Sequence, residues 1–380
     1  MFRNDAVKMI LLIRSLERGG AERQLVILAK SLHELGYNVR VVTFYAGGAL
    51  RPELEAAGVP HSDLGKYGRW DVLGFLFRLV TLLRREKPAL LYSFLPMANV
   101  WGLVAGRLGG VKKIVWGVRT SHMDLWQYDW MARLESRLAI YLSRYADRII
   151  CNSYVGADYH RELGYPPEKL ITIHNGIHTD RFYFEASGRH RLREEWGVGT
   201  GDQVIGIVAR LDPVKDHATA LRAFAEIQNE WPNAKLACIG SGSLLGTLKK
   251  LCMDLGISER LIWAGELQDM AAAYSAVDLV CSCSSGEGFS NTIAEAMACQ
   301  RLCIVTDVGD SARITGETGW IVPAGDHRAL ADAWRQALSL PIAERQIREL
   351  EARAWIADHY SVGSMVTQTI KALEDQYPDR

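Results

Sequence analysis

The chain has 380 residues, 48% of them hydrophobic and 23% charged, and its formal net charge is zero. This composition is ordinary for a soluble globular protein, the length predicts about two domains, and we expect no nucleic-acid partner. The apolar stretch at residues 71–83 is interrupted by Arg78 and is too short to cross a bilayer. We therefore expect no transmembrane helix. The N-terminus has a short apolar stretch without a small-residue cleavage site, so we expect no signal peptide.

Cysteine usage and charge distribution add two expectations. The seven cysteines are odd in number and lie mostly in apolar strands, which favours reduced thiols in a cytoplasmic enzyme. Residues 1–180 hold 24 Lys and Arg against 17 Asp and Glu, whereas the remaining 200 hold 20 against 27. This asymmetry indicates that the first half meets an anionic partner, such as a membrane surface or a phosphate-linked substrate. Scattered surface charge would give the same sums.

Strands and helices alternate from the start of the chain. Residues 7–13 read as a buried strand, Gly19-Gly20 as a turn, and residues 21–36 as a helix with a terminal glycine. Further strands are expected at residues 37–44, 89–94, 112–118, 147–153 and 169–176. The pattern predicts a parallel sheet with crossover helices, which is a Rossmann-like domain.

The alternation restarts after a polar, arginine-rich stretch at residues 181–201, which we interpret as the interdomain connection. Strands are then expected at residues 203–209, 234–240, 260–266, 278–284, 301–307 and 319–325. We predict an α/β fold of two tandem Rossmann-like domains facing a central cleft. The expected domains are residues 1–180 and 181–359, with a last helix at about 360–380 packing back on the first domain. Ligands of such sheets bind beyond the carboxyl ends of the strands.

Three loops at predicted strand ends contain residues suited to a phosphate. Gly19-Gly20 would let backbone approach an anion at the start of a helix, although a tight turn explains both glycines equally well. Arg210 and Lys215 flank a loop that runs into a helix, and such a pair of cations suits a pyrophosphate. Solvated cations, neutralised by a neighbouring aspartate, are the alternative. Gly240 and Gly242 give a weaker signal of the same kind.

The fourth loop is the stretch SSGEGFSNTIAEAMA at residues 284–298, which follows a predicted strand. Its Glu287 lies on a glycine-flanked turn where a carboxylate can accept hydrogen bonds from sugar hydroxyls. Thr292 and Glu295 have the spacing of a capping box, so we expect a helix to begin near Thr292 and Glu295 to have a structural role available.

Taken together, these motifs resemble the retaining family-4 glycosyltransferases of the GT-B fold. The resemblance rests on GGAER at residues 19–23, ITIHNGIHTDRF at 171–182, ARLDPVKD at 209–216 and EGFSNTIAEAMA at 287–298, in the family's order. It covers essentially the whole chain. The family's usual pattern differs at four places: Gln300 to Leu302, Asp310 with Arg313, Asp216, and His174. These departures put the identity of the substrate in doubt more than the activity.

The resemblance implies a role for each matching position. Arg210 and Lys215 would hold and stabilise the departing diphosphate, Glu287 would contact the transferred sugar, and Glu295 would bind the nucleotide ribose. The other donor-binding positions would be Gly20, Gly240, Gly242, Gly288, Phe289, Ser290, Asn291 and Thr292. The family's catalytic histidine matches His122, with Arg119 sharing the role or, with Trp126, contacting the acceptor.

The implied reaction needs no metal and no cofactor beyond a nucleoside-diphosphate-sugar, for which we expect UDP rather than GDP. It moves a sugar, with retention, to a hydroxyl of a glycan or lipid-linked glycan in bacterial-type cell-surface polysaccharide or glycoconjugate synthesis. The alternatives are a nucleotide-sugar epimerase or hydrolase of the same fold, and a non-catalytic sugar-binding relative.

The first domain is expected to bind the acceptor. Its segment at residues 65–88 mixes Trp70, Phe75 and Phe77 with Arg78, Arg84 and Arg85. We expect a crossover helix there, and contact with an anionic membrane is the alternative. We predict a cytoplasmic protein loosely attached to the inner face of the membrane.

Overall fold

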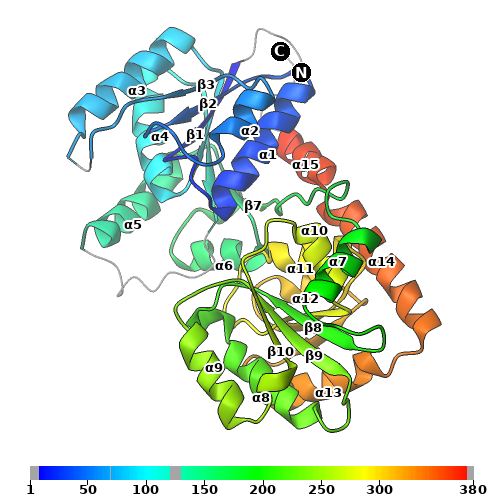
Figure 1. Cartoon of the computed structure of the whole chain (residues 1–380). Coiled ribbons are helices and arrows are strands. Elements are labelled where there is room, and N and C mark those ends of the chain that lie inside the picture. The colour runs from blue at the N-terminus through cyan, green and yellow to red at the C-terminus, as the bar shows by residue number, and fades with distance from the viewer. Residues whose placement is uncertain (1–7, 69, 120–129, 375–380) are drawn as a thin grey trace. The chain divides into compact units, whose positions relative to one another are not determined.

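The structure, a computed structural model, describes residues 8–68, 70–119 and 130–374, without the side chains of residues 130–135. The chain divides into two compact units, one of residues 1–176 and 362–380 and one of residues 177–361 (Figure 1). Each unit is built on its own parallel sheet with helices packed on it. The prediction of two Rossmann-like domains is therefore confirmed.

The first unit contains a seven-stranded sheet in the order β3-β2-β1-β4-β5-β6-β7. Every neighbouring pair of strands is parallel. Its strands are β1 (Lys8–Ile13), β2 (Asn38–Thr43), β3 (His61–Asp63), β4 (Leu90–Phe94), β5 (Lys113–Val118), β6 (Arg148–Cys151) and β7 (Leu170–Thr172). Its helices are α1 (Gly20–Glu34), α2 (Arg51–Ala56), α3 (Leu73–Glu86), α4 (Pro96–Gly109), α5 (Trp130–Leu142), α6 (Tyr154–Glu162) and α15 (Val362–Glu374).

Two hydrophobic clusters cover the two faces of this sheet because successive strand residues point to opposite sides. In β1, Met9 and Leu11 pack with α1, α2 and α15, whereas Ile10 and Leu12 pack with α3 and α4. Figure 1 shows α1 and α15 together on one side and α3, α4 and α5 on the other. The last helix, α15, packs against α1 within this unit.

The second unit contains a six-stranded sheet in the order β10-β9-β8-β11-β12-β13, again parallel throughout. Its strands are β8 (Gln203–Val208), β9 (Ala234–Ile239), β10 (Leu261–Gly265), β11 (Leu279–Ser282), β12 (Leu302–Thr306) and β13 (Trp320–Val322). Its helices are α7 (Ala186–Glu195), α8 (His217–Ile227), α9 (Leu245–Asp254), α10 (Met270–Ala276), α11 (Asn291–Ala298), α12 (Ser311–Thr315), α13 (His327–Leu338) and α14 (Ile342–Tyr360).

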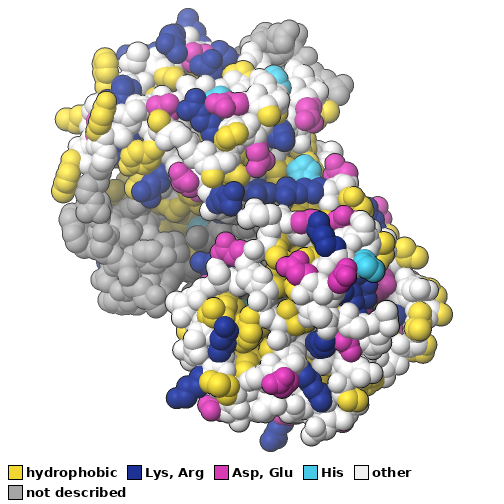
Figure 2. Space-filling model, viewed as in Figure 1, with side chains coloured by type: hydrophobic (Ala, Val, Ile, Leu, Met, Phe, Trp, Pro, Cys, Tyr) yellow, Lys and Arg dark blue, Asp and Glu magenta, His cyan; other side chains and the backbone are white. Residues whose placement is uncertain are grey.

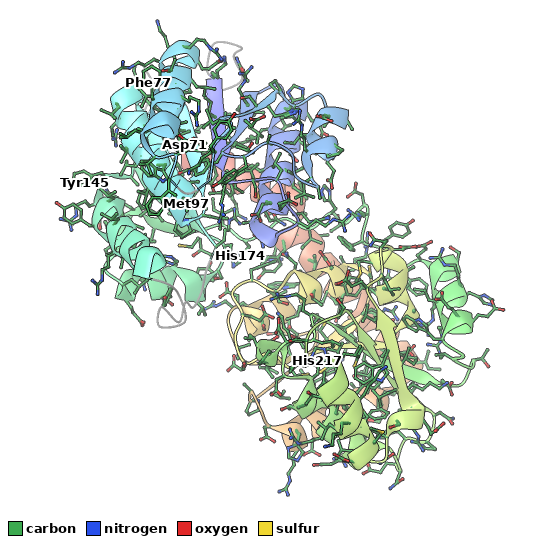
Figure 3. The ribbon with its side chains drawn as sticks, turned by 60° about the vertical axis from the view of Figure 1, so that its left-hand side comes forward. Asp71, Phe77, Met97, Tyr145, His174 and His217 are labelled. Atoms are coloured by element: carbon green, nitrogen blue, oxygen red, sulfur yellow. The ribbon has the colours of Figure 1, made fainter. Side chains whose placement is uncertain are left out.

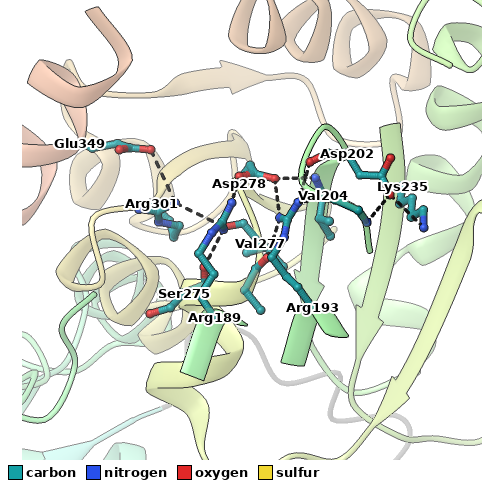
Figure 4. Close-up of polar contacts among 12 residues, drawn as sticks. Arg189, Arg193, Asp202, Val204, Lys235, Ser275, Val277, Asp278, Arg301 and Glu349 are labelled. Carbon is teal, nitrogen blue, oxygen red and sulfur yellow. Dashed lines mark hydrogen bonds and ion pairs between the residues drawn. The ribbon is translucent and has the colours of Figure 1, made fainter. Parts of the chain in front are cut away.

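The arginine-rich stretch that we interpreted as a connection instead forms α7, which packs on α10 inside the second unit. Arg189 and Arg193 both bond to the Asp278 carboxylate, at 2.6 and 3.1 Å, and the Val204 amide donates to it at 2.7 Å (Figure 4). Burial alone would raise the pKa of Asp278, but the arginines and this amide outweigh it and lower the pKa. The arginines therefore hold α7 to the amino end of the sheet.

Candidate functional site

A pocket lies at the carboxyl ends of β8 and β11 in the second unit. The strand order reverses direction between these two neighbours, since β8 is followed on one side by β9 and on the other by β11. Such a switch point is where open α/β sheets bind ligands. The pocket is lined by Ile207, Val208, Ala209, Lys215, Cys281, Ser282, Cys283, Ser284, Glu287, Ser290 and Thr292.

An ion pair between two predicted site residues lines this pocket. The Lys215 ammonium, from the loop between β8 and α8, contacts the Glu287 carboxylate from the loop between β11 and α11. The side chains are only 22% and 14% exposed. The Ser284 hydroxyl donates to the same carboxylate oxygen at 2.8 Å. The fold thus places a cation and a hydrogen-bonding carboxylate side by side at the end of two strands.

Arg210 lies at the start of the same loop, directly after the pocket residue Ala209. Its side chain is 81% exposed, and its guanidinium is 3.0 Å from the Asp212 carboxylate. The loop ends at Asp216, which caps α8 by accepting from the Thr219 amide at 3.3 Å and has a φ of 41°. Glycine, which the family usually has at this position, adopts this left-handed conformation without strain, whereas Asp216 supplies the cap of α8 here.

Glu295 has a different structural setting from the one that we expected. Helix α11 begins at Asn291 with Ser290 as its N-cap, so Thr292 and Glu295 are not in capping-box positions. The prediction of a capping role was therefore wrong. Glu295 instead accepts a hydrogen bond from the buried Tyr274 hydroxyl of α10 at 2.9 Å. Burial and the adjacent Glu295 carboxylate raise the pKa of Tyr274, so its hydroxyl stays protonated as a donor.

The segment between the two glutamates supplies the amino end of α11. Ser290 and Thr292 line the pocket, and Asn291 is the first helical residue. Phe289 is buried, with its ring 5.6 Å from that of Tyr360, so its side chain serves the core. Residues 288–292 therefore offer a ligand the backbone N–H groups at the start of α11 and the hydroxyls of Ser290 and Thr292.

Three glycines allow the loops around the pocket to pack closely. A Cβ on Gly240 would lie 2.1 Å from the Ala209 carbonyl oxygen, and one on Gly242 would lie 2.4 Å from that of Leu211. These two glycines thus have a packing role beside the Arg210 loop. Gly309, which follows β12, has a φ of 60°, and a Cβ there would lie 2.4 Å from the Glu287 carbonyl oxygen. The loop after β12 therefore supports the Glu287 turn directly.

His217, labelled in Figure 3, is the first residue of α8 and directly follows the loop that carries Arg210 and Lys215. It is fully buried, and neither ring nitrogen has a hydrogen-bond partner among the described residues. Burial lowers its pKa to about 4, with Lys215 acting in the same direction and Asp212 and Asp216 opposing it. The imidazole is therefore neutral at pH 7.

In the first unit, Gly20 begins α1 after Gly19, whose backbone is extended. A Cβ on Gly20 would meet no atom within 4 Å, so packing among the described residues does not require glycine there. Arg119 follows β5, donates to the Asn175 side chain at 2.6 Å and lies over the Phe94 ring at 5.2 Å. The predicted residues His122 and Trp126 lie outside the described residues.

Comparison with known proteins decides the family. Residues 18–181 match the model described as Glycosyltransferase Family 4, and residues 202–339 match Glycosyl transferases group 1. The chain belongs to the family-4 glycosyltransferases of the GT-B fold. The resemblance drawn from the separated motifs is thus confirmed as to family and fold.

Individual glycosyltransferases show how far the similarity extends. The N-acetyl-alpha-D-glucosaminyl L-malate synthase of Bacillus anthracis is 31% identical over 195 residues, which are 51% of this chain and 50% of that protein. This chain therefore matches about half the length of that relative. A Campylobacter jejuni N-acetylgalactosamine-N,N'-diacetylbacillosaminyl-diphospho-undecaprenol 4-alpha-N-acetylgalactosaminyltransferase is 25% identical over 80% of this chain and 82% of its own length.

Among solved structures, Anabaena HepE in complex with UDP superposes on this glycosyltransferase with a TM-score of 0.85. The match covers 97% of this chain and 100% of that one at 22% identity, so it supports the shared fold. No helix within the described parts of the chain has the length and apolarity needed to cross a membrane.

Sequence reasoning missed two polar partners of the glutamates, Ser284 and Tyr274. Ser284 had a usable signal, because it ends the predicted strand three residues before Glu287 and at the same sheet edge. Tyr274 had none, since it lies on α10, 21 residues before Glu295 in the chain. Only the fold of the second unit brings its hydroxyl to the carboxylate.

Proposed function

We propose that this glycosyltransferase transfers a sugar, with retention of anomeric configuration, from a nucleoside-diphosphate-sugar to a hydroxyl group. The acceptor is a glycan or lipid-linked glycan of bacterial-type cell-surface polysaccharide or glycoconjugate synthesis. The observation that carries this proposal is the pocket at the β8–β11 switch point, where Lys215, Glu287 and the amino end of α11 meet.

The chemistry of these groups suits a diphosphate leaving group. In the reaction the bond between the anomeric carbon and the diphosphate oxygen breaks. The acceptor hydroxyl oxygen bonds to that carbon from the same face, and its proton passes to the departing diphosphate oxygen. The negative charge that develops on the diphosphate is stabilised by Lys215, by Arg210 and by the N–H groups at the start of α11. No step in this account uses a metal ion.

Glu287 then changes its partner when the donor binds. Without donor, its carboxylate neutralises Lys215 and accepts from Ser284. With donor bound, the diphosphate replaces it as the partner of Lys215, and the carboxylate turns its free oxygens to sugar hydroxyls. Glu295, held by Tyr274, binds the ribose hydroxyls.

We propose a UDP-sugar as donor and a catalytic cycle completed by first-unit residues Gly20, Arg119, His122 and Trp126. The UDP complex of the HepE structure supports the choice of base. The diphospho-undecaprenol named in the Campylobacter relative supports a lipid-linked acceptor. Such an acceptor places the enzyme in the cytoplasm, at the inner face of the plasma membrane.

The test is a panel of UDP- and GDP-sugars screened by thermal shift, followed by release of nucleoside diphosphate with and without lipid-linked or glycan acceptors. We expect a UDP-sugar to raise the melting temperature by several degrees at about 100 times its Kd. We also expect diphosphate release that depends on the acceptor, and a product whose anomeric configuration by NMR equals that of the donor. Acceptor-independent release, sugar isomerisation or inversion would contradict the proposal.

A further inference from the structure

Helix α3 carries a row of exposed apolar side chains on the side that faces away from the sheet. Leu73 and Phe77 are 81% and 73% exposed, and Trp70 and Tyr67, just before the helix, are 79% and 83% exposed. Figure 2 shows hydrophobic side chains gathered along the edge where Figure 1 places α3, and Figure 3 labels Phe77 on this helix. Exposed large apolar side chains grouped in this way mark an interaction surface.

The core does not account for this row, because α3 buries a different one. Phe75, Leu79 and Leu83 are fully buried against the sheet and α4. The expected crossover helix is therefore present, and it presents a second apolar face as well. Of the aromatic residues singled out from the sequence, Phe75 belongs to the core, whereas Trp70 and Phe77 do not.

The exposed row changes from apolar to cationic along the helix. Positions 73, 77, 81, 84 and 85 follow one another at spacings that keep them on one side of a helix. The first two are Leu73 and Phe77, Thr81 follows, and the last two are Arg84 and Arg85, both exposed. We call Tyr67, Trp70, Leu73, Phe77, Arg84 and Arg85 the α3 stripe.

The acidic residues beside the α3 stripe are neutralised within the unit. Asp71 pairs with Arg78, and Glu86 pairs with Lys8, with Arg40 at 3.4 Å and with Arg85 at 3.0 Å. Glu86 thus has three cationic partners, and Arg84 donates to the Leu108 carbonyl rather than to a carboxylate, so the cationic end of the stripe carries surplus positive charge. Neither carboxylate is available to receive the arginines of a second copy of the chain.

The segment that carries the aromatic residues is held in place by hydrogen bonds. The Tyr67 amide donates to the Asp71 carboxylate at 2.9 Å, and Arg78 Nε donates to the Leu64 carbonyl at 2.7 Å. The Lys66 ammonium lies 5.7 Å from the centre of the Phe75 ring. These contacts hold the described residues before α3 to the unit, and the side chains of Tyr67 and Trp70 remain exposed.

We propose that the α3 stripe docks this unit on an anionic lipid surface. Its aromatic and aliphatic side chains enter the boundary between headgroups and acyl chains, and Arg84 and Arg85 contact the negative headgroups. A lipid surface meets both needs of the stripe, since it offers apolar depth and anionic charge side by side. The inference rests on the proposed function in one respect, which is that the proposed lipid-linked acceptor lies at a lipid surface.

Vesicle flotation tests the apolar half. The wild-type chain and the Leu73→Ser/Phe77→Ser variant are mixed at low salt with vesicles of phosphatidylcholine alone or with phosphatidylglycerol added. The matched control is Ile347→Ser/Leu350→Ser on α14, where both side chains are 59% exposed. We expect the wild type and the control to float with the anionic vesicles, and the α3 variant to bind at least about tenfold more weakly. Circular dichroism checks that each variant is folded.

The cationic half is tested by Arg84→Gln/Arg85→Gln. We expect binding to weaken by about fivefold per arginine and to depend less on salt. The inference is overturned if the wild type fails to float, if the Leu73/Phe77 variant floats as well as the wild type, or if phosphatidylcholine alone binds equally. It is also overturned if sedimentation shows a wild-type dimer that the Leu73/Phe77 variant dissolves, because a second copy would then be the occupant.

A transfer assay separates this inference from the proposed function. The Leu73→Ser/Phe77→Ser variant should keep its rate on a water-soluble acceptor and lose rate on an acceptor embedded in vesicles. If the wild type transfers sugar without binding vesicles, the lipid surface is wrong and the activity stands. If it binds vesicles through the α3 stripe and transfers nothing, the proposed activity is wrong and the docking surface stands.

Discussion

Replacing Lys215 by alanine should strongly reduce turnover while leaving the second unit folded. In the proposed reaction its ammonium stabilises the departing diphosphate, and in the structure it lines the pocket and contacts Glu287. Loss of one preorganised charge stabiliser costs about 10²- to 10³-fold in kcat, or about 3–4 kcal/mol of barrier. The stability cost is smaller. The partly exposed Glu287 keeps its bond from Ser284, so we expect about 1–2 kcal/mol of unfolding free energy to be lost.

Lys235 is a matched control. Its ammonium lies 3.0 Å from the Asp202 carboxylate, with side chains 25% and 21% exposed, close to the values for Lys215 and Glu287. Lys235 lies near the amino end of β9, whereas the pocket lies at the carboxyl ends of β8 and β11. Lys235→Ala should therefore cost similar stability and leave kcat unchanged.

The assay pairs release of nucleoside diphosphate at saturating substrate with urea unfolding of each variant. If Lys215→Ala keeps kcat within a few-fold of wild type, the leaving-group role of this residue is refuted. If Lys235→Ala loses as much activity as Lys215→Ala, the loss reflects stability and the role of the pocket is refuted instead.

Three further outcomes follow from the geometry. Gly309→Ala should reduce kcat because the added Cβ would collide with the Glu287 backbone. Gly325 has a φ of 75° and open space around it, so Gly325→Ala should lower the free energy of unfolding by about 1 kcal/mol and leave the activity unchanged. Tyr274→Phe should raise the Kd for UDP about three- to tenfold, measured by calorimetry, by removing the hydrogen bond to Glu295; an unchanged Kd would count against a ribose role. His217 has a folded pKa of about 4, below its unfolded value, so its contribution to stability is complete above about pH 6.5 and is lost as the pH falls. The free energy of unfolding should drop by about 2 kcal/mol between pH 7 and 5 from this group, and His217→Leu should flatten that dependence in urea titrations; an equal slope in the variant would contradict it.

The fold was predictable because nearly every strand of the sheets carries an apolar run at strand length. The exception is β3, which is only His61–Asp63. It is polar, short and at a sheet edge, where no buried face demands apolar residues. Helix α7 was mistaken for a connection because its arginines look solvated in the sequence. Their partner, Asp278, is more than 80 residues away along the chain, so the sequence does not show that the charges are neutralised.

The candidate site was predictable as a set of loops but not as a set of contacts. Parallel topology alone requires that Lys215 and Glu287, which both follow strands, lie at the carboxyl ends of the strands of one sheet. That the two residues form an ion pair depends on β8 being the neighbour of β11, which the order of elements does not specify. The error at Glu295 came from a shift of two residues in the helix start, since the N-cap of α11 is Ser290 and the capping box would require Thr292 there.

The central claim is that the pocket at the β8–β11 switch point holds the diphosphate of the donor. Calorimetric titration of UDP into the wild-type chain, Lys215→Ala and Lys235→Ala tests it most directly. We predict that UDP binds the wild type and Lys235→Ala equally and binds Lys215→Ala at least about tenfold more weakly, as expected for loss of a charged hydrogen bond. Equal affinity for all three proteins would contradict the account.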